Sequence, residues 1–357
     1  MQKGLFGGAS MAAAALLCLL VPVPGLLSQT SDLAPSLLRE WSGARAPVER
    51  GLEYLRSQQL RESGAVSGKY AVAVTSLAGL AVLGAGYQPH QEPYGPMLKR
   101  CIRYILDSGR SGRGFITEGD ESESRMHGHC YAVLFLCEVL GSLEPEEEEE
   151  VARLIKRAVL IIEGAQSKEG GWWYYPENPE NEDEASVTVC ALQALRSARN
   201  VGFHVDSNRI QRAIRYVLKC QDSSDGSFAY STKELRRTTY ALSVAAISTL
   251  NAAGVYESKA LEKGLDFMKK SLDSVRNPWK AAEEEHAFYA NLYAVQALYQ
   301  GGGEMWSRWY PGIRDHLLSK QRANGSWEED RYSREFATAV AVLILEVPLG
   351  YLPIFQR

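Results

Sequence analysis

Three polar side chains, His127, His129 and Cys130, stand just before a long apolar run in "RMHGHCYAVLFLCEVL" (125–140). Histidine and cysteine are common metal ligands, and histidine is also a common acid or base in catalysis. The three residues could equally be the start of a buried helix. Their spacing matches no metal-binding motif, so we expect neither a metal nor a cofactor.

Two carboxylates, Asp183 and Glu184, precede another apolar segment in the same way. A carboxylate near an imidazole can work as an acid–base pair, but it can also be a structural salt bridge or the cap of a helix. Other side chains near the starts of apolar segments could line a cavity, where aromatic rings stabilise a cation or simply fill the core. These further candidates are His127, Tyr131, Arg237, Tyr240, His286, Tyr289 and Glu335.

Internal repeats show which elements must position these residues. Amphipathic segments resembling "GLEYLRSQQ" (51–59) recur six times, and their equivalent residues are spaced by 49 to 57 positions. Each is followed by a glycine-rich turn and then by a segment that is apolar nearly all round, such as "SVTVCALQALRSA" (186–198). A helix of the first kind is half exposed, and one of the second kind is buried on every side.

Six such helix pairs predict an all-α fold, an α/α toroid over residues 48–357, with the amphipathic helices outside and the apolar helices inside. An open helical solenoid is the alternative. In the toroid the six inner helices begin around one mouth of a central cavity. Their N-termini would favour an anion, although the acidic loops that precede them can satisfy the helix ends instead.

The N-terminus begins with Lys3 and a short apolar stretch, followed by prolines and small residues. This layout predicts a signal peptide over 1–28, a linker over 29–47 and an exported protein; an uncleaved membrane anchor is the alternative. Five cysteines remain after the signal peptide, an odd number, and we expect them to be buried free thiols. The net charge of −4 gives no basic footprint, so we expect no nucleic-acid partner.

Three turns carry a glutamine, a glycine and an aromatic residue in phase with the repeat: "QSKEGGWW", "QDSSDGSF" and "QRANGSW". They resemble the QW repeat of the terpenoid cyclase and protein prenyltransferase superfamily. The chain is more narrowly similar to exported bacterial prenyltransferase/squalene-oxidase repeat proteins. The bonding capacity of glutamine and the bulk of the rings predict a structural role for the motif residues. These are Gln166, Trp172, Gln221, Phe228, Gln321 and Trp327.

The resemblance also assigns roles around the cavity. In squalene–hopene-type cyclases a D-x-D-D motif protonates an alkene, and "NEDEAS" (181–186) places Asp183 at the proton donor. Asn181 and Glu184 replace the outer aspartates, which puts that activity in doubt. Protein prenyltransferases bind zinc near elements similar to Cys130–Tyr131 and His286–Tyr289. Those elements fall in repeats two and five, on opposite sides of the ring, so zinc is not expected.

The resemblance singles out His129, and repeats two and three are adjacent. We therefore expect His129 to face Asp183 or Glu184 across the cavity mouth, as catalytic candidates. The predicted function is binding of an apolar, isoprenoid-like small molecule in the cavity, with cyclase-like acid catalysis. The alternative is a non-catalytic binding or scaffold protein that keeps the fold.

Overall fold

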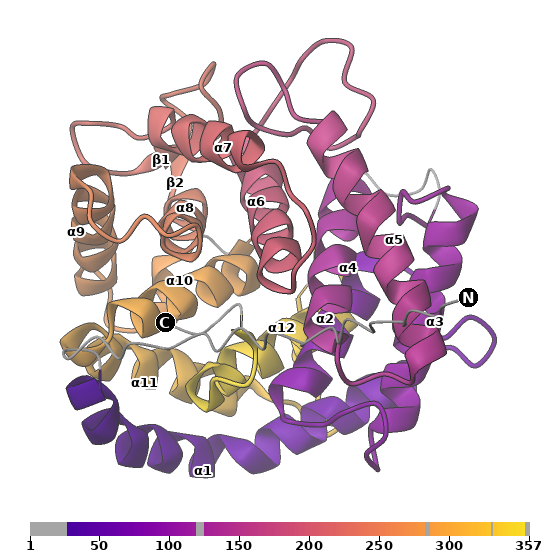
Figure 1. The fold of residues 1–357 in the computed structure, drawn as a ribbon. Coiled ribbons are helices and arrows are strands. Elements are labelled where there is room, and N and C mark those ends of the chain that lie inside the picture. The colour runs from indigo at the N-terminus through magenta and orange to yellow at the C-terminus, as the bar shows by residue number, and fades with distance from the viewer. Residues whose placement is uncertain (1–26, 119–124, 283–285, 330, 354–357) are drawn as a thin grey trace, which may run out of the picture.

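The computed structural model describes residues 27–118, 125–282, 286–329 and 331–353. In these residues, twelve α-helices alternate between an inner and an outer ring (Figure 1). The inner helices are α2 (Ala71–Gly84), α4 (Arg125–Val139), α6 (Ala185–Asn200), α8 (Tyr240–Ala252), α10 (Ala287–Gly301) and α12 (Arg334–Glu346). The outer helices are α1 (Leu27–Gln58), α3 (Gly95–Ser111), α5 (Pro145–Gly164), α7 (Ser207–Lys219), α9 (Lys259–Asp273) and α11 (Gly303–Lys320). The predicted all-α toroid of six helix pairs is confirmed.

The inner ring is closed. Each inner helix packs against the next, and α12 packs against both α2 and α1. Closure needs close approach between helices: a Cβ added to Gly79 of α2 would fall within 2.6 Å of a ring carbon of Phe135 on α4. The open solenoid is therefore excluded by these contacts.

The outer helices have one buried face. On α7 the side chains of Ile210, Ala213 and Val217 are buried, whereas Arg215 is exposed. Asp206 caps this helix through the backbone N–H of Asn208. Short elements complete the connections: β1 (Phe228–Ala229) pairs antiparallel with β2 (Thr238–Thr239), and 3-10 turns lie at η1 (Pro278–Ala281) and η3 (Val347–Leu349). None of the helices in the described ranges is both long and apolar enough to cross a membrane.

Glutamine side chains join successive repeats. The amide of Gln166 donates to the carbonyl of Gly170 in its own turn and to that of Arg209 at the start of α7, both at 2.9 Å. Gln59, Gln221 and Gln321 each make the same two kinds of bond. The second bond thus reaches the next outer helix rather than a free group at the end of the glutamine's own helix.

The aromatic residues of these turns fill the space between the rings. The indoles of Trp172 and Trp327 donate to the carbonyls of Ile162 and Leu317, and Phe228 is fully buried. The predicted structural role of the six motif residues is confirmed by these contacts.

The N-terminal boundary differs from the expectation. Helix α1 begins at Leu27, so the segment 29–47 that was expected to be a linker is helical. Ala44 and Val48 lie on one face of α1 and are fully buried against the core, which explains why the helix extends beyond the first repeat. The expected signal peptide, 1–28, lies almost entirely outside the described residues. All five cysteines from Cys101 to Cys220 are buried and unpaired, as predicted.

Candidate functional site

A cavity of about 410 Å³ opens where the six inner helices begin. Every inner helix contributes to its wall from its first turn or from the residues just before it. The wall contains Tyr70, Ala73, Val74, Glu118, His127, Gly128, Tyr131, Tyr174, Glu184, Ser186, Tyr230, Arg237, Thr239, Ala241, Leu242, His286, Tyr289, Arg331, Tyr332 and Phe336. Six of the candidate site residues are among them: Glu184, His127, Tyr131, Arg237, His286 and Tyr289.

Glu184 is the buried carboxylate of this wall. It is the N-cap of α6, and its oxygens accept the backbone N–H groups of Ser186, at 2.8 Å, and of Val187. Burial raises the pKa of Glu184 to about 7, although these hydrogen bonds and the positive charge of Arg237 act in the opposite direction. The group is therefore poised to exchange a proton near neutral pH.

Ser186 connects Glu184 with His127. The Ser186 hydroxyl lies 2.8 and 2.9 Å from the two carboxylate oxygens and 3.2 Å from Nε2 of His127. Burial lowers the pKa of His127 to about 4, with the contact to Ser186 opposing the shift, so the imidazole is neutral at pH 7. An acid, a hydroxyl and a base thus lie next to one another on the wall.

His129 does not face the cavity, and the expectation that it meets Asp183 or Glu184 is wrong. Its Nδ1 accepts the backbone N–H of Ile116 at 3.0 Å, and Nε2 lies 3.2 Å from the carbonyl of Ala158 on α5. Its side chain is fully buried between the rings. The histidine therefore joins α4 to the outer layer.

Asp183 also lies behind the wall. It accepts the Ser167 hydroxyl at 2.6 Å and is buried next to Tyr216. A molecule bound in the cavity therefore cannot touch it. Tyr240 is buried and does not line the cavity. Glu335 accepts the hydroxyl of Tyr54 at 3.0 Å, on the side of α12 that faces the first repeat.

The opposite wall is formed by α10 and α12. His286 Nδ1 lies 3.3 Å from the hydroxyl of Tyr332, and Tyr289 packs against Tyr293 with ring centroids 4.8 Å apart. Burial raises the pKa values of Tyr131 and Tyr289 well above the ordinary value, so both are neutral aromatic surfaces. Within the described residues no three His, Cys, Asp or Glu side chains gather to hold a metal ion.

Several wall residues were not anticipated from the sequence. Tyr174 and Tyr230 line the cavity, and their hydroxyl groups lie 2.8 Å apart. Each lies two positions after the aromatic residue of its turn, Trp172 or Phe228. That spacing is the signal that could have found them.

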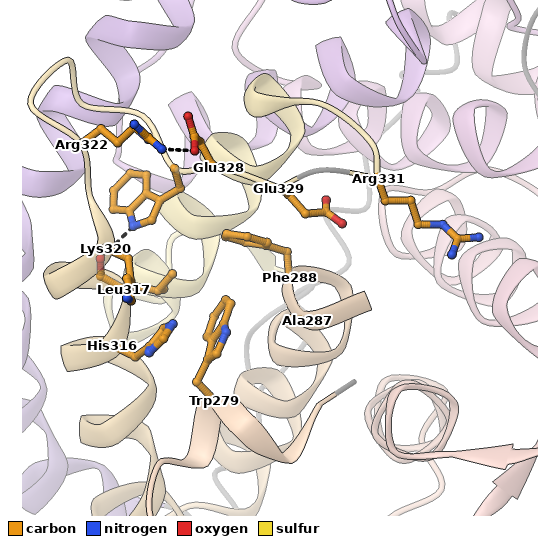
Figure 2. Close-up of a pocket in the computed structure, with 11 residues that line it drawn as sticks. Trp279, Ala287, Phe288, His316, Leu317, Lys320, Arg322, Glu328, Glu329 and Arg331 are labelled. Carbon is orange, nitrogen blue, oxygen red and sulfur yellow. Dashed lines mark hydrogen bonds and ion pairs between the residues drawn. The ribbon is translucent and has the colours of Figure 1, made fainter. Parts of the chain in front are cut away.

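A second pocket, of about 670 Å³, lies between repeats five and six (Figure 2). Its floor is aromatic: Trp279 stacks on His316 with centroids 4.9 Å apart, and Phe288 meets Trp279 edge-on. Arg322 and Glu328 form an ion pair at its rim (Figure 2). Arg331 lines both pockets, but in Figure 2 it points away from Trp279. This pocket contains none of the candidate site residues.

Solved structures with this fold carry out different reactions. An alpha-1,6-mannanase of Salegentibacter sp. aligns with a TM-score of 0.61 and 11% identity over 85% of this chain and 98% of its own. The type II terpene cyclase MstE from Scytonema gives 0.57 and 14% over 89% and 99%, and the cellobiose 2-epimerase from Spirochaeta thermophila gives 0.60 and 12% over 89% and 98%. At such identities the likeness concerns the fold alone.

No curated protein matches the sequence significantly. The model of one family matches the sequence over residues 45–271 and again over 202–345. Together the two ranges span most of the chain. The architecture of the described residues is the alpha-alpha toroid that this family model describes. The chain belongs to the prenyltransferase alpha-alpha toroid domain family.

Proposed function

We propose that the central cavity binds a small molecule with an apolar body, and that an isoprenoid is the first candidate. The observation that carries this proposal is the aromatic wall: among the described residues that line the cavity are seven tyrosine and phenylalanine rings, and Glu184 is the one fully buried carboxyl group among them. A toroid of this kind from Scytonema, the terpene cyclase MstE, has been seen with geranylgeranyl dihydroxybenzoate as substrate, which supports the choice of ligand class.

Proton transfer by Glu184 is the chemistry that the wall supports. Alkene protonation of the cyclase kind needs a much stronger acid than a carboxyl group with a pKa of about 7. Asp183, the residue at the proton-donor position of the cyclase motif, does not reach the cavity. The proposed step is therefore an exchange of protons with an oxygen or an activated carbon of the ligand.

A binding protein without catalysis is the second candidate. It is favoured by the hydrogen bonds of Glu184, which accepts two backbone N–H groups at the start of α6 and so already has a structural role. In this case Glu184→Gln would leave ligand binding intact and no chemical change of the ligand would be found with the unmodified protein.

Native mass spectrometry and lipid extraction of the purified protein test the ligand. Geranylgeraniol and squalene are the apolar probes, and mannotriose and cellobiose are the polar comparators. Ala241 lies in the wall, so Ala241→Trp should fill the cavity and abolish binding of the apolar probes. Lys320→Ala, in the second pocket, is the matched control and should bind normally. Binding of the sugars alone, or equal binding by the Ala241→Trp variant, would refute the proposal.

We also propose that the protein is exported, on the basis of the N-terminal sequence alone. N-terminal sequencing of the protein from its native cells should find a start near residue 28 in an extracytoplasmic fraction. A cytoplasmic protein that still begins at Met1 would exclude export.

A further inference from the structure

Ser186 lies where a nucleophile would be activated. Its Oγ is 3.2 Å from Nε2 of His127, which is close to the distance between serine and histidine in acyl-transfer enzymes. The side chain is half-buried and forms part of the cavity wall, so that a bound molecule can touch it. Neither the cyclase motif nor the prenyltransferase motif uses a serine at this place.

His127 is suited to accept the serine proton. Burial disfavours the charged form, so the imidazole is neutral at physiological pH and one of its two ring nitrogens is unprotonated. Glu184 competes for the same hydroxyl hydrogen when it is ionised. When Glu184 is protonated, it can donate to Ser186, and Ser186 then donates to His127.

The negative charge that forms during attack must be stabilised by donors on the cavity wall. Ser186 is in the first turn of α6, near the positive end of the helix. The N–H groups of Ser186 and Val187 already bond to Glu184, so the charge on a reacting carbonyl oxygen must be met by other donors. Arg237, which lies over the ring of Tyr230, and the Tyr174–Tyr230 hydroxyl pair are on the same wall.

We propose that Ser186 is a nucleophile activated by His127, and that the cavity hydrolyses esters with a long apolar chain. Ser186 Oγ bonds to the acyl carbon while its proton passes to His127 Nε2. The bond from the acyl carbon to the alcohol oxygen breaks, and the alcohol leaves with that proton. Water then attacks the acyl group, which releases the carboxylic acid and restores the serine. The inference rests on the proposed binding of an apolar molecule in this cavity.

An alkyl fluorophosphonate, which modifies activated serines without needing the natural substrate, tests the nucleophile. Intact mass and peptide mapping should find one adduct, on Ser186, and none in Ser186→Ala. His127→Gln should slow the modification about 100-fold, the contribution of a general base. Ser333, the N-cap of α12, is the internal control and should stay unmodified.

The rates of hydrolysis of p-nitrophenyl decanoate and p-nitrophenyl acetate test the substrate class. The decanoate should be cleaved faster by the unmodified protein, and Ser186→Ala and Ser186→Thr should both lose this activity while keeping their thermal unfolding temperature. If Ser186 is not modified by saturating probe although geranylgeraniol binds, the nucleophile is refuted and the proposed ligand class stands. If Ser186 is modified but the acetate is the better ester and no apolar probe binds, the long-chain ester class and the proposed function both fail.

Discussion

Glu184 carries a titration that can be measured directly. Its pKa is about 7 in the folded protein against 4.5 for an ordinary glutamate, so its contribution to stability is full below pH 4.5 and is lost as the pH rises through 7. Each unit within this window costs up to about 1.4 kcal/mol. The difference in unfolding free energy between Glu184→Gln and the unmodified protein should therefore shift in favour of the variant between pH 4.5 and 7.

Denaturant unfolding at several pH values measures that difference, and the ¹³C NMR shift of the Glu184 carboxyl group measures the pKa itself. A difference that is flat with pH, or a carboxyl group that titrates near 4.5, would contradict the buried and neutral state inferred for Glu184.

Glu346, at the end of α12, is another buried carboxyl group. Neither of its oxygens has a hydrogen-bond partner among the described residues, and burial together with the charge of Glu49 raises its pKa well above the ordinary value. The sign is the same as for Glu184: stability is lost as the pH rises from 4.5 towards the raised pKa. We expect Glu346→Gln to raise the unfolding temperature at pH 8 and to have little effect at pH 4. A lower unfolding temperature at pH 8 would show that the charged form is stabilised.

It was predictable that the candidate residues lie at the end of the toroid where the inner helices begin. The direction in which their side chains point was not predictable. His127 and His129 are two residues apart, about 200° around a helix, so only one can face the cavity. Helix α4 is apolar nearly all round, and no polar stripe marks which side faces inward. Asp183 and Glu184 are consecutive in extended backbone and therefore point to opposite sides. In both pairs the choice depends on tertiary contacts with the outer layer.

The turns between the rings depend on close contact of backbones. Gly170 has φ of +109°, and a Cβ at this position would fall 2.6 Å from the carbonyl oxygen of Arg212 on α7. Gly202 also has a positive φ, +93°, but nothing lies within 4 Å of the place where its Cβ would be. A substitution at Gly202 therefore tests the cost of the backbone conformation alone, whereas a substitution at Gly170 adds the cost of the contact with α7.

We expect Gly202→Ala to lower the unfolding free energy by about 1 kcal/mol, the cost of the left-handed conformation. Gly170→Ala should cost a further ~1–3 kcal/mol, because α7 must move away from the turn. Chemical denaturation of both variants checks this. Equal losses would mean that the turn does not hold α7 in solution.

The alternation of outer and inner helices was predictable because repetition and amphipathic patterning both point to it. The contact between repeats five and six was not predictable, because the turn of repeat five lacks the glutamine and the glycine of the repeated motif. There, Pro278 packs on Gly312 of α11, and Trp279 stacks on His316. These contacts replace the motif with residue types that carry no recognisable repeat signal. The extension of helix α1 over the expected linker was not predictable either, because the residues of the last repeat that it contacts are remote in sequence.

At the scale of the whole molecule, the toroid brings six helix N-termini to one cavity. In the described residues, carboxylates and hydroxyls already meet several of these positive ends: Glu118 accepts the N–H of Val72, and Glu184, Thr239 and Ser333 cap their own helices. An anionic ligand would have to displace these caps. The arrangement therefore favours a ligand that uses the aromatic wall over one held by its negative charge.

The closure of the ring depends on the contact between the first and the last repeat. Gly51 of α1 allows this contact, since a Cβ there would fall 2.6 Å from a side-chain methyl of Val342 on α12 and 3.1 Å from the ring of Trp327. Gly51→Leu should therefore push α1 away from α12, at a cost of about 1–3 kcal/mol or more. Gly43→Leu, on the same helix with nothing within 4 Å, is the matched control and should leave stability unchanged.

Hydrogen–deuterium exchange locates the effect. In the Gly51→Leu variant, exchange should rise together in residues 44–58 and in residues 321–329 and 331–345, which are far apart in sequence and meet where the ring closes. The bond from Gln321 to the carbonyl of Pro47 lies at the same seam and should be lost with it. Faster exchange in α1 alone, with α12 still protected, would mean that the last repeat is held by its own neighbours and that closure contributes little to its stability.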